Sequence, residues 1–186
     1  MKEIVKPAVV LLIITAVAAM LLGIVSETTQ GAIAAQTAKT EAEAMAAVMP
    51  EDGIEFETLF DKENGDEIEG TIKKIAKATK GGETIGYVLT TAPSGFGGEV
   101  GTMVGVAVDG TVTGLRVLSH AETPGLGALA TSPDFYEQFV GKSGNIQVTK
   151  DGGEIVPITS ATITSRAVAS GAAEAVEWVN ANGGAN

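Results

Sequence analysis

The sequence contains no cysteine and only one histidine among its 186 residues. Without thiols the chain can form no disulfide, no thiolate metal site and no cysteine nucleophile. A single histidine likewise excludes a zinc site built from several imidazoles. Basic residues are also few, because 12 lysines and arginines stand against 23 acidic residues, a formal net charge of −11. Since nucleic-acid binding needs a basic surface, this balance argues against a nucleic-acid partner.

A long apolar run lies near the N-terminus. Residues 7–25 form 19 consecutive positions without a charge, and a helix of that length spans about 28 Å, close to the thickness of a bilayer core. Lys2 and Lys6 precede the run, which predicts a cytoplasmic N-terminus and an extracytoplasmic main domain. The run also lacks any ionisable residue, so we do not expect ions to pass through it.

A cleaved signal peptide is the alternative interpretation of this segment. Residues 32–34 (Ala-Ile-Ala) have the small residues of a cleavage site. However, the apolar run is longer than the apolar region of a signal peptide, which is about 7–15 residues. The length therefore favours a retained, single-pass anchor in the cytoplasmic membrane, and both interpretations export the rest of the chain.

The next segment has the composition of a connector. Residues 37–48 are rich in alanine, glutamate and methionine and stop before Pro50, which predicts a helix. Residues 51–69 hold nine acidic residues against one lysine, together with two turn signals, Asp52-Gly53 and Asn64-Gly65. We expect a solvated, turn-rich stretch, and its carboxylates lack the spacing of a calcium loop. The predicted division is an anchor at 1–26, a connector at 27–69 and a folded domain at 70–186.

The folded domain is predicted to be α+β, with a mainly antiparallel sheet and flanking helices. Four strands are expected, at residues 71–79, 84–91, 100–108 and 111–119. Asp109-Gly110 predicts a type I′ turn in the second hairpin, and the lysines of the first strand indicate a solubilising edge or, alternatively, a docking patch. A short helix at 134–140, a further strand at 145–150 and a helix over 168–179 complete the domain.

Two loops have the composition of a binding site. Residues 93–98 contain three glycines, but Val100 stands where a dinucleotide fingerprint needs its third glycine. This loop is either a sharp crossing between strands or a place where backbone approaches a planar ligand. Residues 120–127 place His120, Glu122 and Thr123 beside a Pro-Gly turn. His120 could act as an acid or base or simply hold structure, and Glu122 could be a surface carboxylate.

A hydroxyl-rich stretch precedes the last helix. Residues 159–165 contain five serines and threonines at a loop-to-helix transition, where unpaired backbone N–H groups and the helix dipole favour an anion such as phosphate. The alternative is that these residues are ordinary helix caps. Arg166 follows four residues after Thr162, so it would share a helix face with Thr162 and could pair with a phosphate.

In combination these motifs resemble one family. The sequence is similar to the G-subunit family of the Rnf/Rsx electron-transport complex in its anchor, its alanine-rich helix ending at residues 44–50, its loop at 94–98, its Leu-Ser-His-Ala-Glu-Thr-Pro-Gly-Leu-Gly run at 118–127 and its terminal threonine motif at 159–166. The C subunit of the sodium-pumping NADH:quinone reductase shares the last two motifs and is typically longer. The resemblance implies an electron-carrying, membrane-anchored flavoprotein of an ion-translocating ferredoxin:NAD oxidoreductase, working with other membrane subunits.

The resemblance also implies a covalent cofactor. In the family, FMN is attached through a phosphoester to the last threonine of a Ser/Thr-Gly-Ala-Thr motif, which corresponds here to Thr162. Ser160 replaces the usual glycine and would be crowded if its φ must be positive. Because the sequence shows no base beside Thr162, attachment needs a separate flavin transferase. The ring would then lie toward residues 122–127, where Glu122 or Thr123 could bond its polar atoms and Leu126 could pack on its face.

The complete set of predicted cofactor-binding residues comes from the three motifs, and no catalytic or metal-binding residue is predicted. The set is Gly95, His120, Glu122, Thr123, Gly125, Leu126, Gly127, Thr159, Ser160, Ala161, Thr162, Thr164 and Arg166. Two alternatives remain at this point. The chain could be a component like the C subunit of the sodium-pumping reductase, or a non-redox exported module that binds a ligand or a partner.

Overall fold

A computed structural model of the chain describes residues 2–183. The chain forms two compact units, Met1–Ala42 and Glu43–Asn186. The first unit contains most of helix α1 (Lys2–Val48), which continues without a break past the apolar run. The predicted anchor and the helix predicted before Pro50 are therefore parts of one helix.

The apolar run of α1 meets the requirements of a membrane span. Within the described residues, α1 is the one helix that is long and apolar enough, by length and composition, to cross a bilayer, and an 18-residue stretch of it has a mean hydropathy of 3.0. The hydroxyls of Thr15, Thr28 and Thr29 donate to carbonyls three or four residues earlier in the helix. Since these side chains are satisfied within the helix, Thr15 adds no unpaired polar group to the apolar run, and Thr28 and Thr29 add none just after it.

The second unit is built on a five-stranded antiparallel sheet with the order β1-β2-β3-β4-β5. The strands are β1 (Ile54–Asp61), β2 (Ile72–Lys80), β3 (Glu83–Thr91), β4 (Gly101–Ala107) and β5 (Val112–Ser119). The α+β class and the four predicted strands are thus confirmed. Consecutive strands pair throughout, so short connections suffice.

Strand β1 corrects the prediction for the acidic segment. Its first residues alternate between apolar side chains, Ile54 and Phe56, and acidic ones, and two acidic residues of the strand pair with lysines of β2. Glu57 lies 2.8 Å from Lys77, and Glu51, just before the strand, lies 2.9 Å from the lysine that ends β2. The prediction of a turn-rich stretch is therefore wrong for these residues. The lysine-bearing strand is also no edge, because β1 covers it.

Three other local predictions need correction. Gly110 has φ +81° but Asp109 does not have positive φ, so the hairpin turn is not type I′. Instead, Asp109 accepts from Thr111 N–H at 2.9 Å, a bond that holds the pKa of Asp109 below its ordinary value. Residues 145–150 form one isolated bridge and the short helix η4 (Thr149–Asp151) rather than a strand. The short helix is split into α2 (Pro133–Tyr136) and η3 (Glu137–Phe139).

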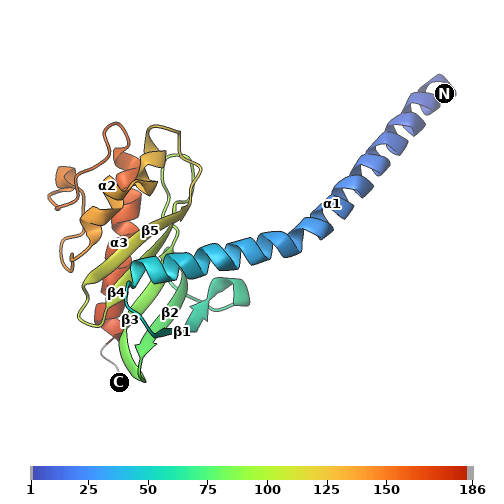
Figure 1. Ribbon diagram of the computed structural model, residues 1–186. Helices are drawn as coiled ribbons and strands as arrows, with labels where there is room; N and C mark the ends of the chain where they lie inside the picture. The colour runs from blue at the N-terminus through green and yellow to red at the C-terminus, as the bar shows by residue number, and fades with distance from the viewer. Residues whose placement is uncertain (1, 184–186) are drawn as a thin grey trace. The chain divides into compact units, whose positions relative to one another are not determined.

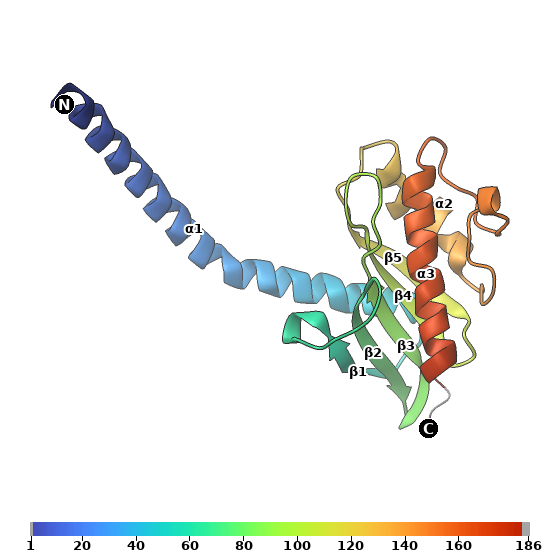
Figure 2. The ribbon, with the colours of Figure 1, turned by 180° about the vertical axis from the view of Figure 1, so that it is seen from behind.

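Helices cover both faces of the sheet within the second unit. Helix α3 (Thr162–Asn182) lies along one face, and the last turn of α1 lies on the other, as the opposite views of Figures 1 and 2 show. The α3 face encloses the main core, which includes Leu89, Val104 and Val176. On the other face, Val48 and Met49 pack with Met103. The sheet is therefore buried on both sides at its centre.

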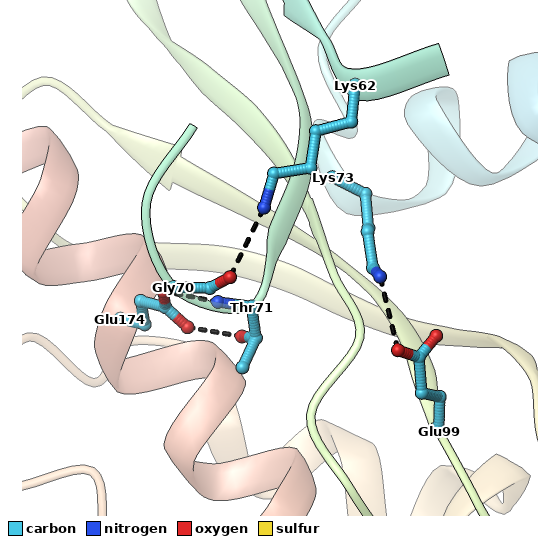
Figure 3. A network of polar contacts seen from close by, with 6 residues as sticks. All are labelled: Lys62, Gly70, Thr71, Lys73, Glu99 and Glu174. Atoms are coloured by element: carbon cyan, nitrogen blue, oxygen red, sulfur yellow. Dashed lines mark hydrogen bonds and ion pairs between the residues drawn. The ribbon is translucent and has the colours of Figure 1, made fainter. Parts of the chain in front are cut away.

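Helix α3 is also fixed by a polar contact. Glu174 accepts from the backbone N–H of Thr71 at 2.9 Å and from the Thr71 hydroxyl, while Lys62 donates to the carbonyl of Gly70 (Figure 3). Gly70 has φ +70°, and a Cβ there would collide with Glu174. This contact joins the start of β2 to the middle of α3.

Candidate functional site

The three motifs meet at one end of the sheet. Strand β3 ends, β4 begins and β5 ends at this end, and α3 also begins there, so the loops at 93–98 and 120–127 lie near the hydroxyl-rich stretch (Figures 1 and 2). Antiparallel pairing produces this arrangement, because neighbouring strands run in opposite directions. The last residues of β3 and β5 therefore lie beside the first residues of β4. Hydrogen bonds then join the three segments.

Glu122 is the centre of these bonds. Its side chain is 7% exposed. Oε1 accepts from the backbone N–H groups of Phe96 at 2.8 Å and Gly97 at 3.1 Å, and Oε2 accepts from the hydroxyl of Thr164 at 2.9 Å. The interpretation of Glu122 as a surface carboxylate is therefore wrong. A buried carboxylate persists when several donors satisfy it, as here.

Glycines make room for this carboxylate. A Cβ on Gly95 would lie 2.3 Å from Oε1 of Glu122, and a Cβ on Gly127 would lie 2.3 Å from Oε2. Gly97 similarly approaches the carbonyl of Ala121, at 2.2 Å from its ideal Cβ. The backbone at Gly95 and at Gly127 thus closely approaches Glu122, a residue of the chain itself.

The rest of the 120–127 loop is exposed. His120 accepts at Nδ1 from the N–H of Glu122 at 3.2 Å, an arrangement that favours its structural interpretation over acid–base chemistry. Thr123 and Gly125 are exposed, and Gly125 has φ +75°. Leu126 is 41% exposed, so its side chain is available to a ligand.

The hydroxyl-rich stretch is divided by burial. Thr164 and Ser165 are buried, and Ser165 accepts from Ile158 N–H and donates to the Ala161 carbonyl, both at 2.9 Å. Thr162, the first residue of α3, is half-buried. Ala161 is buried and caps the helix without a side-chain hydrogen bond. The first N–H groups of α3 therefore stay open to an anion, and the hydroxyls of Thr159, Ser160 and Thr162 are the accessible ones.

Lys150 is a site residue that the sequence interpretation missed. Its Nζ lies 3.0 Å from Oγ1 of Thr162. The two residues are twelve apart and belong to different elements, η4 and α3. No periodicity links them, and the wrong assignment of 145–150 as a strand concealed the turn that brings them together.

Arg166 pairs with a carboxylate of the chain itself. It binds Asp151 through two hydrogen bonds, from Nε at 2.6 Å and from a terminal nitrogen at 2.7 Å. This guanidinium holds the pKa of Asp151 below its ordinary value, and Asp151 in turn raises the pKa of Arg166. In this structure Arg166 thus fixes the η4 turn against α3.

Ser160 has an unusual backbone. Its φ is +63°, and it is the one non-glycine residue with positive φ in the described chain. An L-residue other than glycine pays for this conformation through contact of its Cβ with the backbone. The position therefore does have the positive φ at which a serine is crowded.

A recess of about 430 Å³ lies beside this site along α3. Arg166 and Asp151 line one part, and small residues such as Ala169 and Ala173 line another, with Glu177 among its carboxylates. It does not include Thr162 or the 120–127 loop. The recess is therefore a second surface next to the hydroxyl-rich stretch.

Known proteins resemble this chain in sequence, in part of it or over nearly its whole length. Residues 95–177, which contain most of the three motifs and the larger part of α3, match the family model of the FMN-binding domain. The G subunit of the ion-translocating oxidoreductase complex of Methanosarcina acetivorans is 36% identical over 185 residues and 98% of each chain. The chain belongs to the G-subunit family of these complexes. Another member of the family, the G subunit of the Na⁺-translocating ferredoxin:NAD⁺ oxidoreductase complex of Acetobacterium woodii, is 36% identical over 91% of this chain and 88% of that protein.

A solved structure shares the fold of this family member. The C subunit of the Na⁺-translocating NADH-quinone reductase from Parabacteroides distasonis superimposes with a TM-score of 0.52 at 22% identity, covering 71% of this chain and 78% of that one. This likeness concerns the fold alone. Since the relatives that match over the whole chain are G subunits, the alternative of a component like the C subunit is not favoured.

Proposed function

We propose that this protein carries electrons through an FMN group attached to Thr162, within a membrane complex that couples ferredoxin:NAD oxidoreduction to ion transport. The match to the FMN-binding domain supports the cofactor, and the relatives' names support the complex. The observation that carries the attachment site is the accessibility of Thr162 beside Lys150, in contrast to the buried Thr164.

The residues of the site fit the phosphate end of FMN. The open N–H groups of α3, the Thr162 hydroxyl and the Lys150 ammonium form a donor set suited to an anion. Arg166 completes this arrangement indirectly, since it holds the η4 turn through Asp151. The flavin ring would extend toward the exposed Leu126. In this arrangement Glu122 fixes the loop and does not bond the ring.

When bound, FMN supplies the redox chemistry, and the chain supplies position. Glu122 keeps the two loops and the first turn of α3 in register through its three hydrogen bonds. Leu126 and Phe96, which is 73% exposed, offer apolar surface at this end of the domain. This surface would exclude water from one side of a ring.

A denaturing gel tests the proposal. The full chain is expressed with a flavin transferase, and the band is examined for flavin fluorescence under ultraviolet light. We expect a fluorescent band for the wild type and for Thr164→Val, and a dark band for Thr162→Val. A dark wild-type band would refute the carrier function. A fluorescent Thr162→Val band with a dark Thr159→Val band would move the attachment to Thr159.

We also propose that α1 anchors the protein in the cytoplasmic membrane in a single pass, with the N-terminus inside and the second unit outside. Lys2 and Lys6 before the apolar run support this orientation. Protease added to intact spheroplasts should digest the second unit, while a tag before Lys2 stays protected until the membrane is opened. If the second unit were protected from the protease instead, the proposed orientation would be wrong.

A further inference from the structure

The ammonium of Lys150 is available to an anion at Thr162. Lys150 is exposed, and within the described part of the chain it has no carboxylate within ion-pair distance. Its contact at 3.0 Å is with the Thr162 hydroxyl. Arg166 is the other cation nearby, but Asp151 neutralises it through two hydrogen bonds. Asp151 also attracts Lys150, but from beyond ion-pair distance, so in a chain of net charge −11 Lys150 supplies positive charge beside Thr162.

The backbone around Lys150 is held in place before any ligand arrives. Thr149 N–H donates to the carbonyl of Ile155 at 2.8 Å, and Gly152, at φ +86°, closes the turn by donating to the Thr149 carbonyl at 3.2 Å. The neighbouring Val148 and Ile155 are buried in the main core. The turn that carries Lys150 is thus fixed, and from it the lysine side chain reaches Thr162.

We propose that Lys150 is a positioning residue for flavin attachment, which binds the phosphate of the incoming flavin at the Thr162 hydroxyl and stays beside it in the product. This inference rests on the proposed function. An ammonium only donates hydrogen bonds, so Lys150 cannot take the hydroxyl proton. Its effect is electrostatic, through attraction of the phosphate oxygens and stabilisation of the charge that develops on them.

The attachment step then balances with a flavin dinucleotide as donor. Oγ1 of Thr162 forms a bond to the phosphorus of the FMN half, and the bond from this phosphorus to the bridging pyrophosphate oxygen breaks. The hydroxyl proton goes to a base of the transferase, and the nucleoside monophosphate leaves with the bridging oxygen. No electron is gained or lost, and no oxidant is needed.

The test is the initial rate of covalent flavin incorporation into the purified full chain in detergent, measured by in-gel fluorescence with excess transferase and flavin dinucleotide. We expect Lys150→Met to slow incorporation at least about tenfold and Lys150→Arg to stay within about threefold of wild type, because charge rather than shape is required. Lys142→Met is the matched control, since Lys142 pairs with Glu154 instead, and should leave the rate unchanged. The melting temperatures of all variants should agree, because an exposed contact contributes little to stability.

A second readout does not depend on the rate. In the flavin-loaded chains, the phosphorus-31 resonance should differ between wild type and Lys150→Met when folded and coincide after denaturation. A Lys150→Met chain with the wild-type rate and resonance would overturn the role of Lys150 while leaving the carrier function intact. Loss of rate in both Lys150→Met and Lys150→Arg with a lowered melting temperature would also overturn it. A dark wild type would instead refute the carrier function itself.

Discussion

At the scale of single residues, Ser160 has a strained backbone conformation, which its sequence neighbours do not have. Its φ of +63° is unfavourable for serine by about 1–2 kcal/mol. Glycine removes this cost, but it raises the conformational entropy of the unfolded chain, which destabilises the fold by about 0.4–1 kcal/mol. We therefore expect Ser160→Gly to stabilise the fold by about 0.5–1 kcal/mol, seen as a higher melting temperature in detergent. Ser143→Gly, at an exposed residue without positive φ, should not stabilise, and an equal gain there would contradict the strain argument.

Among the site residues, Glu122 is the one whose substitution should lower the free energy of unfolding most. Glu122→Ala leaves two N–H groups and the Thr164 hydroxyl without their acceptor, so we expect a loss of about 2–3 kcal/mol in the free energy of unfolding. Urea titration followed by the fluorescence of Trp178, which packs edge-on against Tyr87, measures it. Glu122→Gln should lose less, since its amide oxygen still accepts. Equal midpoints for Glu122→Ala and the exposed control Glu137→Ala would show that the bonds are dispensable.

Single residues also show how much of the site a sequence pattern can predict. The motif at 120–127 and the threonine stretch were predicted as one site, and the fold does place them together. The contact between Glu122 and Thr164, 42 positions later, was not predicted, because a sequence does not show which distant residue will donate to a carboxylate. Lys150 was missed for the same reason, since only the tertiary fold brings it to Thr162.

At the scale of elements, the η4 turn and α3 depend on the charge of Asp151. Because Arg166 lowers the pKa of Asp151 in the folded chain, the pair stabilises the fold above the ordinary pKa of an aspartate. This contribution is lost as the pH falls through the lowered folded pKa. We expect wild type to melt above Asp151→Asn at pH 7 and the two melting temperatures to converge as the pH falls through the lowered pKa of Asp151. The exposed control Glu67→Gln should show no such trend, and a difference that grows in acid would have the wrong sign.

Strand β1 explains why one element was missed while four were found. The apolar strands β3 and β4 are buried at the sheet centre and follow simple composition rules. Strand β1 carries alternating acids whose partners are the lysines of β2, so its density of charge looked like that of a solvated segment. The alternation of Ile54 and Phe56 with Glu55 and Glu57 was the available signal, because a period of two marks a strand with one exposed face.

At the scale of the whole molecule, the folded unit begins before β1. The hydroxyl of Thr113 donates to the carbonyl of Val48 at 2.6 Å, and Gly105 and Gly114 allow the α1 backbone to approach the sheet. We expect a chain of residues 43–186 to unfold in one cooperative transition. A chain of residues 70–186 should melt lower and aggregate, because it exposes the β2 edge. Circular dichroism with heating measures both, and equal melting temperatures would place the start of the domain at residue 70.

The enclosure of Glu122 by Gly95 and Gly127 constrains the order in which this protein can change during evolution. An alanine at either glycine would collide with the carboxylate of Glu122 and would also lie 2.7 Å from Val100 or Thr164, so a smaller residue at 122 removes only part of the clash. The cost of each substitution therefore depends on the others, and the combined effect is not additive. Lineages that replace Glu122 first therefore lose either glycine at a lower cost than lineages that still carry Glu122.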